Sequence, residues 1–264
     1  MREAWKAWAF LKLGLLTDVS YKFSFAFQVV DILLGIAAFY FLAQLLGEKT
    51  PQGYASFPFI LIGMAVNGYM TTSMVCFAQG VRGDQLMGTF KAMLATRTSP
   101  LTLILLSSLY PLVRAAVDAG LYLLGGVLFG LSLGQVNVPA ALLCFLVSLI
   151  AFSSIGIFSA TFTLVFKRGD PLLWLFGSLS WLLGGVFYPL EVLPPFLQHA
   201  AQLLPITHAL EAMRAAVLSD AAVAELLPQL WALALLGLVG LPMSLAGFSL
   251  GVRRARVTGT LSHY

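Results

Sequence analysis

One long apolar run limits strongly what this chain can fold into. Residues 138–166, VPAALLCFLVSLIAFSSIGIFSATFTLVF, contain no Asp, Glu, Lys or Arg. A helix needs about 20 apolar residues to cross the hydrocarbon core of a bilayer, and several other runs in the chain reach that length. Backbone groups inside lipid must be paired within their own segment, so such runs form helices. We therefore expect an all-α polytopic membrane protein.

The composition agrees with this class. The chain has 264 residues, of which 59% are hydrophobic and 10% are charged, whereas soluble domains average about 25% charged residues. Cys76 and Cys144 fall in separate apolar runs without metal-ligand spacing, and such cysteines usually pack as small hydrophobic residues. The first 22 residues carry scattered charges and no cleavage site, so we do not expect them to act as a secretory signal peptide.

Six transmembrane helices are expected along the chain. They comprise residues 23–46, 57–79, a helix within 101–130, a helix within 138–166, 171–189 and 229–251. The whole chain, 1–264, is then a single transmembrane domain. Its parts are an interfacial helix (1–22), spans one to five (23–190), a re-entrant segment (191–228), span six (229–252) and a tail (253–264).

The basic residues orient these spans. Twelve of the 15 Lys and Arg precede span one, lie between spans two and three or four and five, or follow span six. Short loops rich in Lys and Arg stay in the cytoplasm, so both termini are expected inside, with residues 191–228 outside. That outer segment is net acidic. The positive net charge therefore reports topology, and nucleic acid is not an expected partner.

Two amphipathic helices are expected on the cytoplasmic side. Apolar residues of the first 22 share one face with two tryptophans, which favour the headgroup layer. The segment from residue 84 to about 95 has one apolar face, and such a helix either lies on the membrane or docks into another protein. That apolar face comprises Leu86, Met87, Phe90, Met93 and Leu94, with Asp84, Gly88 and Lys91 opposite.

Three charged residues fall within or near the spans. Charges at this depth are costly and usually face a bundle interior or water. Arg114 and Asp118 are four residues apart on span three, where they can neutralise each other. Asp31 has no partner in its own helix, so a structural and a functional role both stay open. Three such groups on two helices do not establish a proton relay.

Prolines break the apolar segment before the last span into two short helices. Pro195–Leu204 and Ile206–Leu218 are too short to cross a bilayer, a length typical of re-entrant helices. Pro205 ends the first and starts the second. Their polar residues need protein or water around them, so we expect the pair to line or cap a cavity. His199 and His208 lack a carboxylate partner at metal spacing, and no metal site is expected.

The chain lacks the P-loop motif for ATP binding. No G-x-x-x-x-G-K-[ST] motif occurs, so a P-loop cannot form. The stretches outside the membrane are also too short for a soluble catalytic domain. We expect a non-enzymatic chain without a cofactor of its own.

The stretch GGVFYPLEVLPPFLQHAAQLLPITHALEAMR, together with the helix order, resembles the permease subunit of type-2 ABC transporters. The resemblance covers essentially the whole chain. The residues that carry it most specifically are Gly184, Gly185, Pro189, Pro194, Pro205, His208 and Arg214.

This resemblance implies partners and roles. Two permease copies would form the pathway in a bacterial inner membrane, with two separate ATPase subunits holding ATP and Mg²⁺. The helix at about 84–95 would be the cytoplasmic coupling helix, with the N-terminal helix beside it. The helices within 195–218 would be re-entrant extracellular helices that close the outer end. Transport would proceed by alternating access, driven by nucleotide-dependent movement of the ATPases.

The expected pathway wall is mainly apolar and carries no rings of charge. It comprises Phe39, Asn67, Met70, Trp174 and Trp181. Lipid contact or helix packing is the alternative for each of them. Such a wall suits a lipid-like or amphipathic cargo, and a glycan also fits the resemblance. A stand-alone secondary transporter would need inverted repeats and ion-coupling carboxylates, and a non-transporting scaffold would not need the re-entrant pair.

Overall fold

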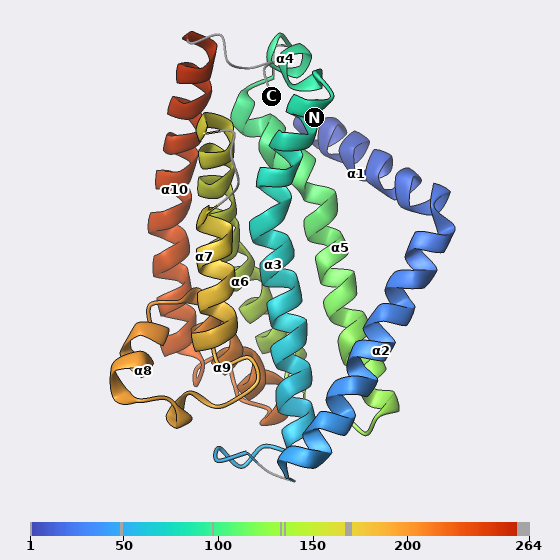
Figure 1. Ribbon diagram of the computed structural model, residues 1–264, viewed down its shortest axis with the longest axis vertical. Coiled ribbons are helices and arrows are strands. Elements are labelled where there is room, and N and C mark those ends of the chain that lie inside the picture. Colours follow the sequence, from blue (N-terminus) through green and yellow to red (C-terminus); the bar gives the residue numbers. More distant parts are fainter. Residues whose placement is uncertain are drawn as a thin grey trace.

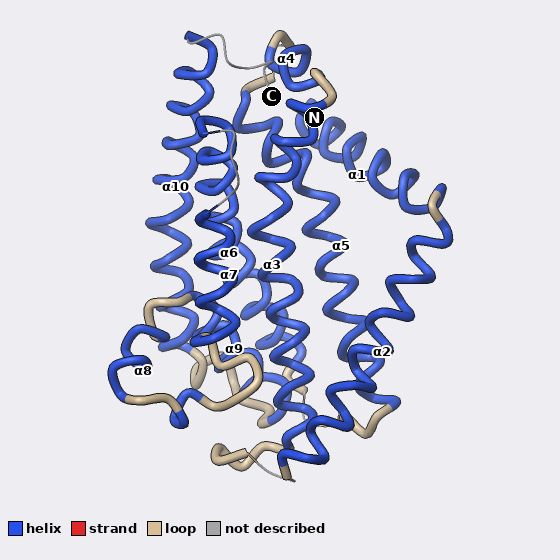
Figure 2. The backbone as a smooth tube through the Cα atoms, viewed as in Figure 1, coloured by secondary structure: helices blue, strands red, loops and turns tan. Residues whose placement is uncertain are grey.

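The computed structural model describes residues 2–47, 50–96, 98–132, 134, 136–166 and 171–257. Within these ranges the regular elements are all helices (Figure 2). They are α1 (Arg2–Ser20), α2 (Lys22–Leu46), α3 (Ser56–Leu86), α4 (Thr89–Leu94), α5 (Pro100–Leu128), α6 (Val138–Phe166), α7 (Pro171–Leu183), the 3₁₀ turn η1 (Leu190–Val192), α8 (Pro195–Ala201), α9 (Pro205–Leu218) and α10 (Leu227–Val257).

The long helices form one bundle with α3 near its centre. Figure 1 shows α3, α5, α6, α7 and α10 along the long axis, while α1 and α2 form an open V at one side. We call the end with α4 the α4 end, and the end with α8 and α9 the α9 end. The helices α6 and α10 pack along much of their length, and α3 packs against both α5 and α6.

Small residues bring the central helices close together. A Cβ atom added to Gly156 of α6 would lie 2.6 Å from the carbonyl oxygen of Ser73 on α3. Phenylalanines fill the remaining space, and Phe59, Phe77, Phe152 and Phe248 are fully buried. The main core therefore lies between α3, α6, α9 and α10. A further buried cluster joins Ile32, Ile36 and Ala43 of α2 to Phe59 of α3.

Five helices (α2, α3, α5, α6 and α10) are long and apolar enough to cross a membrane. The expected fifth span, 171–189, is shorter than the sequence suggested. Its helix α7 has 13 residues, about 20 Å at 1.5 Å per residue. After Leu183 the chain leaves the helix, and Gly185 adopts a φ of +75° that favours glycine. The rest of the expected span, residues 184–189, is not helical.

The expected amphipathic helix at 84–95 is divided into two parts. Asp84 and Leu86 belong to the last turn of α3, which continues seven residues beyond the expected end of span two. Gly88, with a φ of +70°, turns the chain, and α4 then covers only Thr89–Leu94. A left-handed glycine is the usual way to end a helix, and it changes the direction of the segment here.

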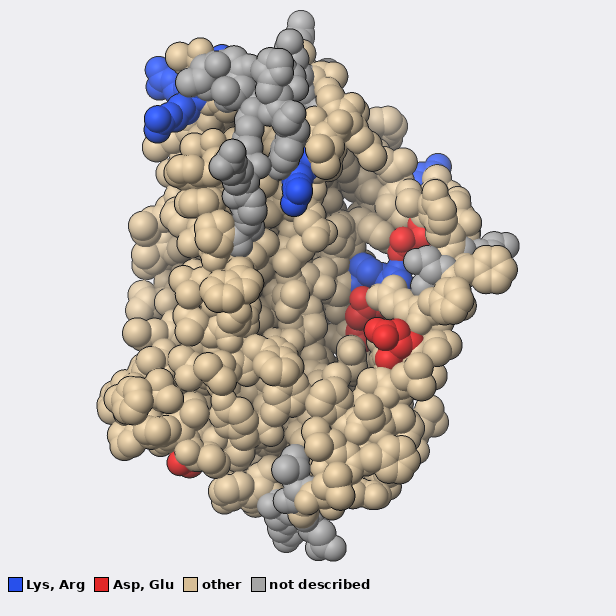
Figure 3. Space-filling model, in the orientation of Figure 1, with Lys and Arg blue, Asp and Glu red and all other residues tan. Residues whose placement is uncertain are grey.

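The molecular surface is that of a helical membrane protein. Figure 3 shows a broad uncharged belt, with basic side chains near the α4 end and mixed charges in the notch beside α1 and α2. Large apolar side chains are exposed within this belt, such as Leu238 at 77% and Trp231 at 71%. Such a surface is suited to lipid rather than to water.

Candidate functional site

The proline-broken segment forms the expected pair of short helices. Pro194 precedes α8, which begins at Pro195, and Pro205 is the first residue of α9. Proline at this position removes only an N–H that would lack a helical partner anyway. Most residues of α9 are buried, and α9 packs against α6, α10 and α3. The second short helix is thus inserted into the bundle at the α9 end.

Two adjacent glycines, Gly184 and Gly185, let the chain turn from the end of α7 and pass close to α9. A Cβ atom on Gly184 would lie 2.3 Å from the carbonyl oxygen of Ser180 and 2.6 Å from Ile206 on α9. Gly185 adopts the left-handed φ described above. Pro189 then precedes the turn η1, and the ring Nε2 of His208 lies 2.8 Å from the carbonyl oxygen of Gln202. These residues shape the backbone of the segment, and the histidine braces the start of α9.

Arg214 joins this segment to α3, and its hydrogen-bond partners within the described residues are backbone carbonyls. Its side chain is buried, and Nε and Nη2 donate to the carbonyl oxygen of Phe59 at 3.3 and 3.2 Å. Nη2 also donates to the carbonyl oxygen of Val186 at 2.9 Å. The guanidinium carbon lies 3.4 Å from the ring centroid of Phe59, a cation–π contact. Burial lowers the pKa of Arg214 to about 9, so it stays protonated at neutral pH.

Gly63 makes this arrangement possible. A Cβ atom there would lie 2.1 Å from the carbonyl oxygen of Val186 and 3.0 Å from Nη2 of Arg214. Sequence reasoning included Arg214 but missed Gly63, Phe59 and Val186. Because Arg214 contacts backbone carbonyls, its partners leave no charge pattern in the sequence.

A polar pocket of about 330 Å³ opens beside Arg214. Its polar walls are Gln52, Tyr54, Glu191, Thr207, Glu211, Arg214 and Gln229. Nε2 of Gln52 donates to both carboxylate oxygens of Glu191, at 2.8 and 3.0 Å. Burial raises the pKa of Glu211, an effect that His208 and Gln229 partly offset. Of the two short helices that were expected to line or cap a cavity, α9 lines this pocket, together with residues 184–191.

The open face of the bundle between α2, α3 and α7 carries a row of uncharged polar residues. Asn67, Thr71 and Gln79 lie on the exposed side of α3, with Thr71 and Gln79 exposed and Asn67 half-buried. Spacings of four and eight residues place them on one helix face. Figure 1 shows α3 between α7 and α2 in this view. Of these residues the sequence had indicated only Asn67.

An aromatic cluster lies between α2 and α7. The ring of Phe187 stacks on Phe39 of α2, with centroids 5.4 Å apart, and meets Trp181 of α7 edge-on at 5.0 Å. The structure thus brings together two of the expected wall residues through Phe187, which the sequence had not indicated.

Trp174 is 73% exposed on α7. Met70 is 2% exposed and lies within the core, so its assignment to the wall is wrong in this structure.

The segment expected to couple to a partner is exposed at the α4 end. Leu86 and Met87 are 61% and 80% exposed, whereas Met93 and Leu94 are half-buried. The side chains of Phe90 and Lys91 lie outside the described part of the structure.

Contacts from other elements hold this segment in place. Thr89 donates to the carboxylate of Asp84 at 3.2 Å. Arg256 of α10 donates to the carbonyl oxygen of Leu94 at 3.4 Å. Lys6 of α1 donates to Thr98 at 3.2 Å. The apolar face is thus split between an exposed turn and a packed helix, and α1 and α10 are both tied to this end.

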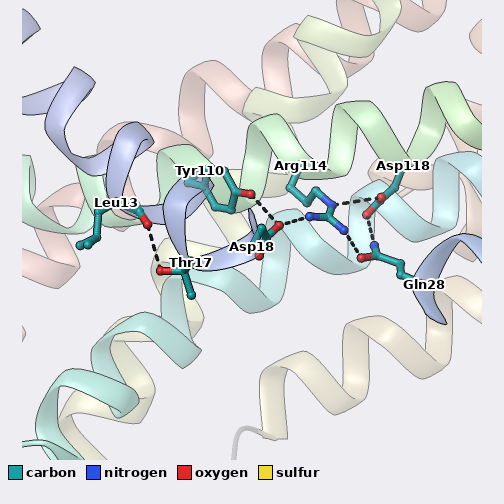
Figure 4. A network of polar contacts seen from close by, with 7 residues as sticks. All are labelled: Leu13, Thr17, Asp18, Gln28, Tyr110, Arg114 and Asp118. Atoms are coloured by element: carbon teal, nitrogen blue, oxygen red, sulfur yellow. Dashed lines mark hydrogen bonds and ion pairs between the residues drawn. The ribbon is translucent and has the colours of Figure 1, made fainter. Parts of the chain in front are cut away.

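A polar network joins α1, α2 and α5 beside the V (Figure 4). Arg114 forms ion pairs with Asp18 of α1 and with Asp118, the latter at 3.4 Å, which confirms the expected i,i+4 pair. Gln28 of α2 accepts from Arg114 and donates to Asp118 at 2.8 Å. The hydroxyl of Tyr110 donates to Asp18 at 2.5 Å. The sequence did not indicate Asp18, Gln28 or Tyr110, because 86 to 96 residues separate the helix partners from Arg114 or Tyr110.

The remaining intramembrane acid, Asp31, is exposed on α2, one turn beyond Gln28. The sequence had left its role open, and the structure places it beside the network. Among the described residues, no group of three or more His, Cys, Asp or Glu side chains could hold a metal ion.

Comparison with known proteins agrees with this architecture. A search of curated proteins gave no match. A family model described as ABC-2 type transporter matches residues 7–218, which include α1, the network on α5, the open face of α3 and α7, and both short helices. The match covers most of the chain, so the chain belongs to the ABC-2 type transporter family and is a transmembrane permease of an ABC transporter.

Proposed function

We propose that this chain is the permease subunit of an ATP-driven exporter. Two copies, in our proposal, face each other through α2, α3 and α7, and separate ATPase subunits supply ATP and Mg²⁺. Membership of the family implies an ABC ATPase partner. The homodimer and the direction of transport are our inference.

The polar row on α3 carries this proposal. Asn67, Thr71 and Gln79 lie on an open helix face of a protein whose other exposed surfaces are mostly apolar. Polar side chains avoid lipid and face a bundle interior or a water-filled cavity. The described part of this chain does not cover the row. In our proposal the row faces a hydrated pathway, and a second subunit forms the opposite side of that pathway. The cluster of Phe39, Phe187 and Trp181 would narrow the pathway toward the α9 end.

We place the α4 end in the cytoplasm of a bacterial cell. Arg253, Arg254 and Arg256 end the last helix there, as the positive-inside rule requires of a cytoplasmic end. The exposed turn at Leu86 and Met87, continued by α4, would dock the ATPase. Because α1 and α10 contact this segment, a movement of the ATPase would reach both helices.

The residues proposed to line the pathway favour a cargo with both apolar and hydrogen-bonding parts. Trp174 and Trp181 supply flat apolar surfaces, and the row on α3 supplies neutral donors and acceptors. Such surfaces suit an amphipathic lipid-like molecule or a glycan better than an inorganic ion, which would need charged or carbonyl ligands.

The first test is a tagged purification from the native membrane in mild detergent, with mass spectrometry and an ATP-hydrolysis assay. A stoichiometric P-loop subunit with measurable hydrolysis is the expected result. Repeated recovery of this chain without any ATPase would contradict the proposal and favour a secondary transporter or a scaffold.

Cysteine labelling tests the hydrated row directly. In a background with Cys76 and Cys144 replaced by serine and alanine, a Thr71→Cys variant should react with a charged, membrane-impermeant maleimide in the purified complex. A Leu238→Cys variant, on the lipid-facing side of α10, is the matched control and should not react. Equal protection of both positions would exclude a water-filled pathway at α3.

A further inference from the structure

A second cavity, away from the open face of α3, lies between α1 and α5. Its volume is about 420 Å³. Four aliphatic side chains form its walls, Leu15 and Val19 from α1 and Val113 and Val117 from α5. All four are close to half exposed. At one end the cavity reaches Tyr110, Asp18 and Arg114.

The aliphatic walls of this cavity favour hydrocarbon. The cavity opens on an apolar surface of the molecule, and α1 is an amphipathic helix whose Trp5 and Trp8 are exposed as an interfacial helix requires. Water between two apolar walls gains few hydrogen bonds. An acyl chain from the adjoining leaflet would bury the four aliphatic side chains instead.

The polar end of the cavity offers one open carboxylate oxygen. Both described contacts of the Asp18 carboxylate, with Tyr110 and with Arg114, use Oδ2. The described part of the structure gives Oδ1 no hydrogen-bond donor, and the Asp18 side chain is 37% exposed. Asp18 lies in the last turn of α1, close to Tyr21, the elbow between α1 and α2, where an interfacial helix meets the lipid headgroups. A donor on a headgroup can therefore reach it.

The charge around this oxygen selects the headgroup. Arg114 is paired with both Asp18 and Asp118, Asp31 is exposed on α2, and Lys12 is exposed on α1. The side chain of Lys22, beside the elbow, lies outside the described residues. The open carboxylate oxygen of Asp18 itself repels an anionic headgroup and attracts a cation. An ammonium group also donates a charge-assisted hydrogen bond to a carboxylate.

We propose that the cavity between α1 and α5 binds a phospholipid with a primary-ammonium headgroup, such as phosphatidylethanolamine. The ammonium group contacts Oδ1 of Asp18, and one acyl chain lies between Leu15, Val19, Val113 and Val117. The lipid comes from the leaflet at the α4 end, which is the cytoplasmic one in the orientation proposed above. This lipid joins α1 to α5 from the bilayer side and does not enter the pathway.

The test measures lipid retained by the full chain, together with any subunits that copurify. The purified protein is equilibrated with mixed micelles of phosphatidylethanolamine and phosphatidylglycerol in equal amounts, washed, and its bound lipid is quantified by mass spectrometry. The variants are Asp18→Asn, which removes the charge, and Val117→Trp, which fills the cavity. Leu238→Trp adds the same bulk on an exposed face of α10 and is the matched control.

The wild-type protein and the control should retain phosphatidylethanolamine in preference to phosphatidylglycerol. In Asp18→Asn this preference should fall about tenfold, the factor expected for one lost charge-assisted hydrogen bond. In Val117→Trp the retained lipid itself should be lost. Equal retention of both lipids by the wild-type protein, or an unchanged preference in Asp18→Asn, would overturn the headgroup assignment. Full retention by Val117→Trp would overturn the site.

Discussion

Arg214 and Arg114 are held in opposite ways. Arg214, near the α9 end, is buried, and its described partners are two backbone carbonyls and the ring of Phe59. Arg114, in the notch beside α1 and α2, is partly exposed and pairs with two carboxylates and an amide from three helices. The first is built into one rigid site, whereas the second connects helices that otherwise contact one another only moderately.

This difference has an energetic consequence. A buried group that loses its partners suffers the full cost of desolvation, whereas an exposed group recovers solvation by water. Substitutions around Arg214 should therefore destabilise the fold, and substitutions around Arg114 should mainly free α1 and α2 from α5.

Arg214→Ala should have the largest effect of all. It removes three hydrogen bonds and a cation–π contact, leaves the carbonyl of Val186 without this donor, and opens space beside Phe59. We expect about 3–4 kcal/mol of lost stability, seen as a lower thermal midpoint by tryptophan fluorescence in detergent. Arg214→Lys should recover little of this loss, because a single ammonium cannot reproduce the planar fork. A midpoint equal to the wild-type value would show that the site is not rigid.

Gly63→Ala should cause the next largest loss of stability. The new Cβ would lie 2.1 Å from the carbonyl oxygen of Val186, a backbone atom that cannot rotate away, so α3 and residues 184–187 must separate. We expect a loss of about 2 kcal/mol. Gly68→Ala on the same helix is the control, since a Cβ there meets nothing within 4 Å. Similar midpoints for the two variants would contradict close packing at Gly63.

Arg114→Gln should destabilise the protein less. Its ion pairs are partly exposed and screened, so we expect about 1 kcal/mol. The sharper readout is local: hydrogen exchange of α1 backbone amides should become faster, while exchange in α9 should stay unchanged. If α9 and α1 were affected equally, the two arginine sites would belong to one cooperative unit and the comparison would fail.

The sequence was sufficient to locate most of the helices and insufficient to identify most of the partners of either arginine. Long apolar runs located α2, α3, α5, α6 and α10, because the bilayer sets the length of such helices. Proline positions located α8 and α9. Glycines end two helices earlier than the apolar pattern predicts. Gly88 separates the expected helix at 84–95 into the end of α3 and the short α4, and α7 ends at Leu183, before Gly184 and Gly185.

Partners were harder to predict than elements. Asp118 could be paired with Arg114 from its spacing on one helix, but Asp18 and Gln28 come from distant segments whose approach depends on the angle between α1 and α2. The backbone carbonyls that hold Arg214 have no sequence signal at all. Met70 shows the converse error, since an apolar residue on a span gives no sign of whether it faces the pathway or the core.

Glu211→Gln should have the smallest effect and the opposite sign. Burial raises the pKa of Glu211 in the folded protein, so its carboxyl group binds a proton more tightly there than in the unfolded chain. Its contribution to stability is therefore complete at pH values below the unfolded pKa and is lost as the pH rises through the folded one. Glutamine keeps the neutral form at every pH, so the variant should gain stability at pH 7.5 and none at pH 4.

The gain should stay below about 1 kcal/mol, because the side chain is partly open to water in the pocket. Glu191→Gln is the matched control on the opposite wall, where the carboxylate already accepts two contacts from Gln52. Thermal midpoints of both variants across pH 4 to 8 would separate them. A loss of stability in Glu211→Gln at pH 7.5 would mean that the ionised carboxylate supports Arg214, three residues further along α9. The α9-end site would then depend on an ion pair, as the network around Arg114 does.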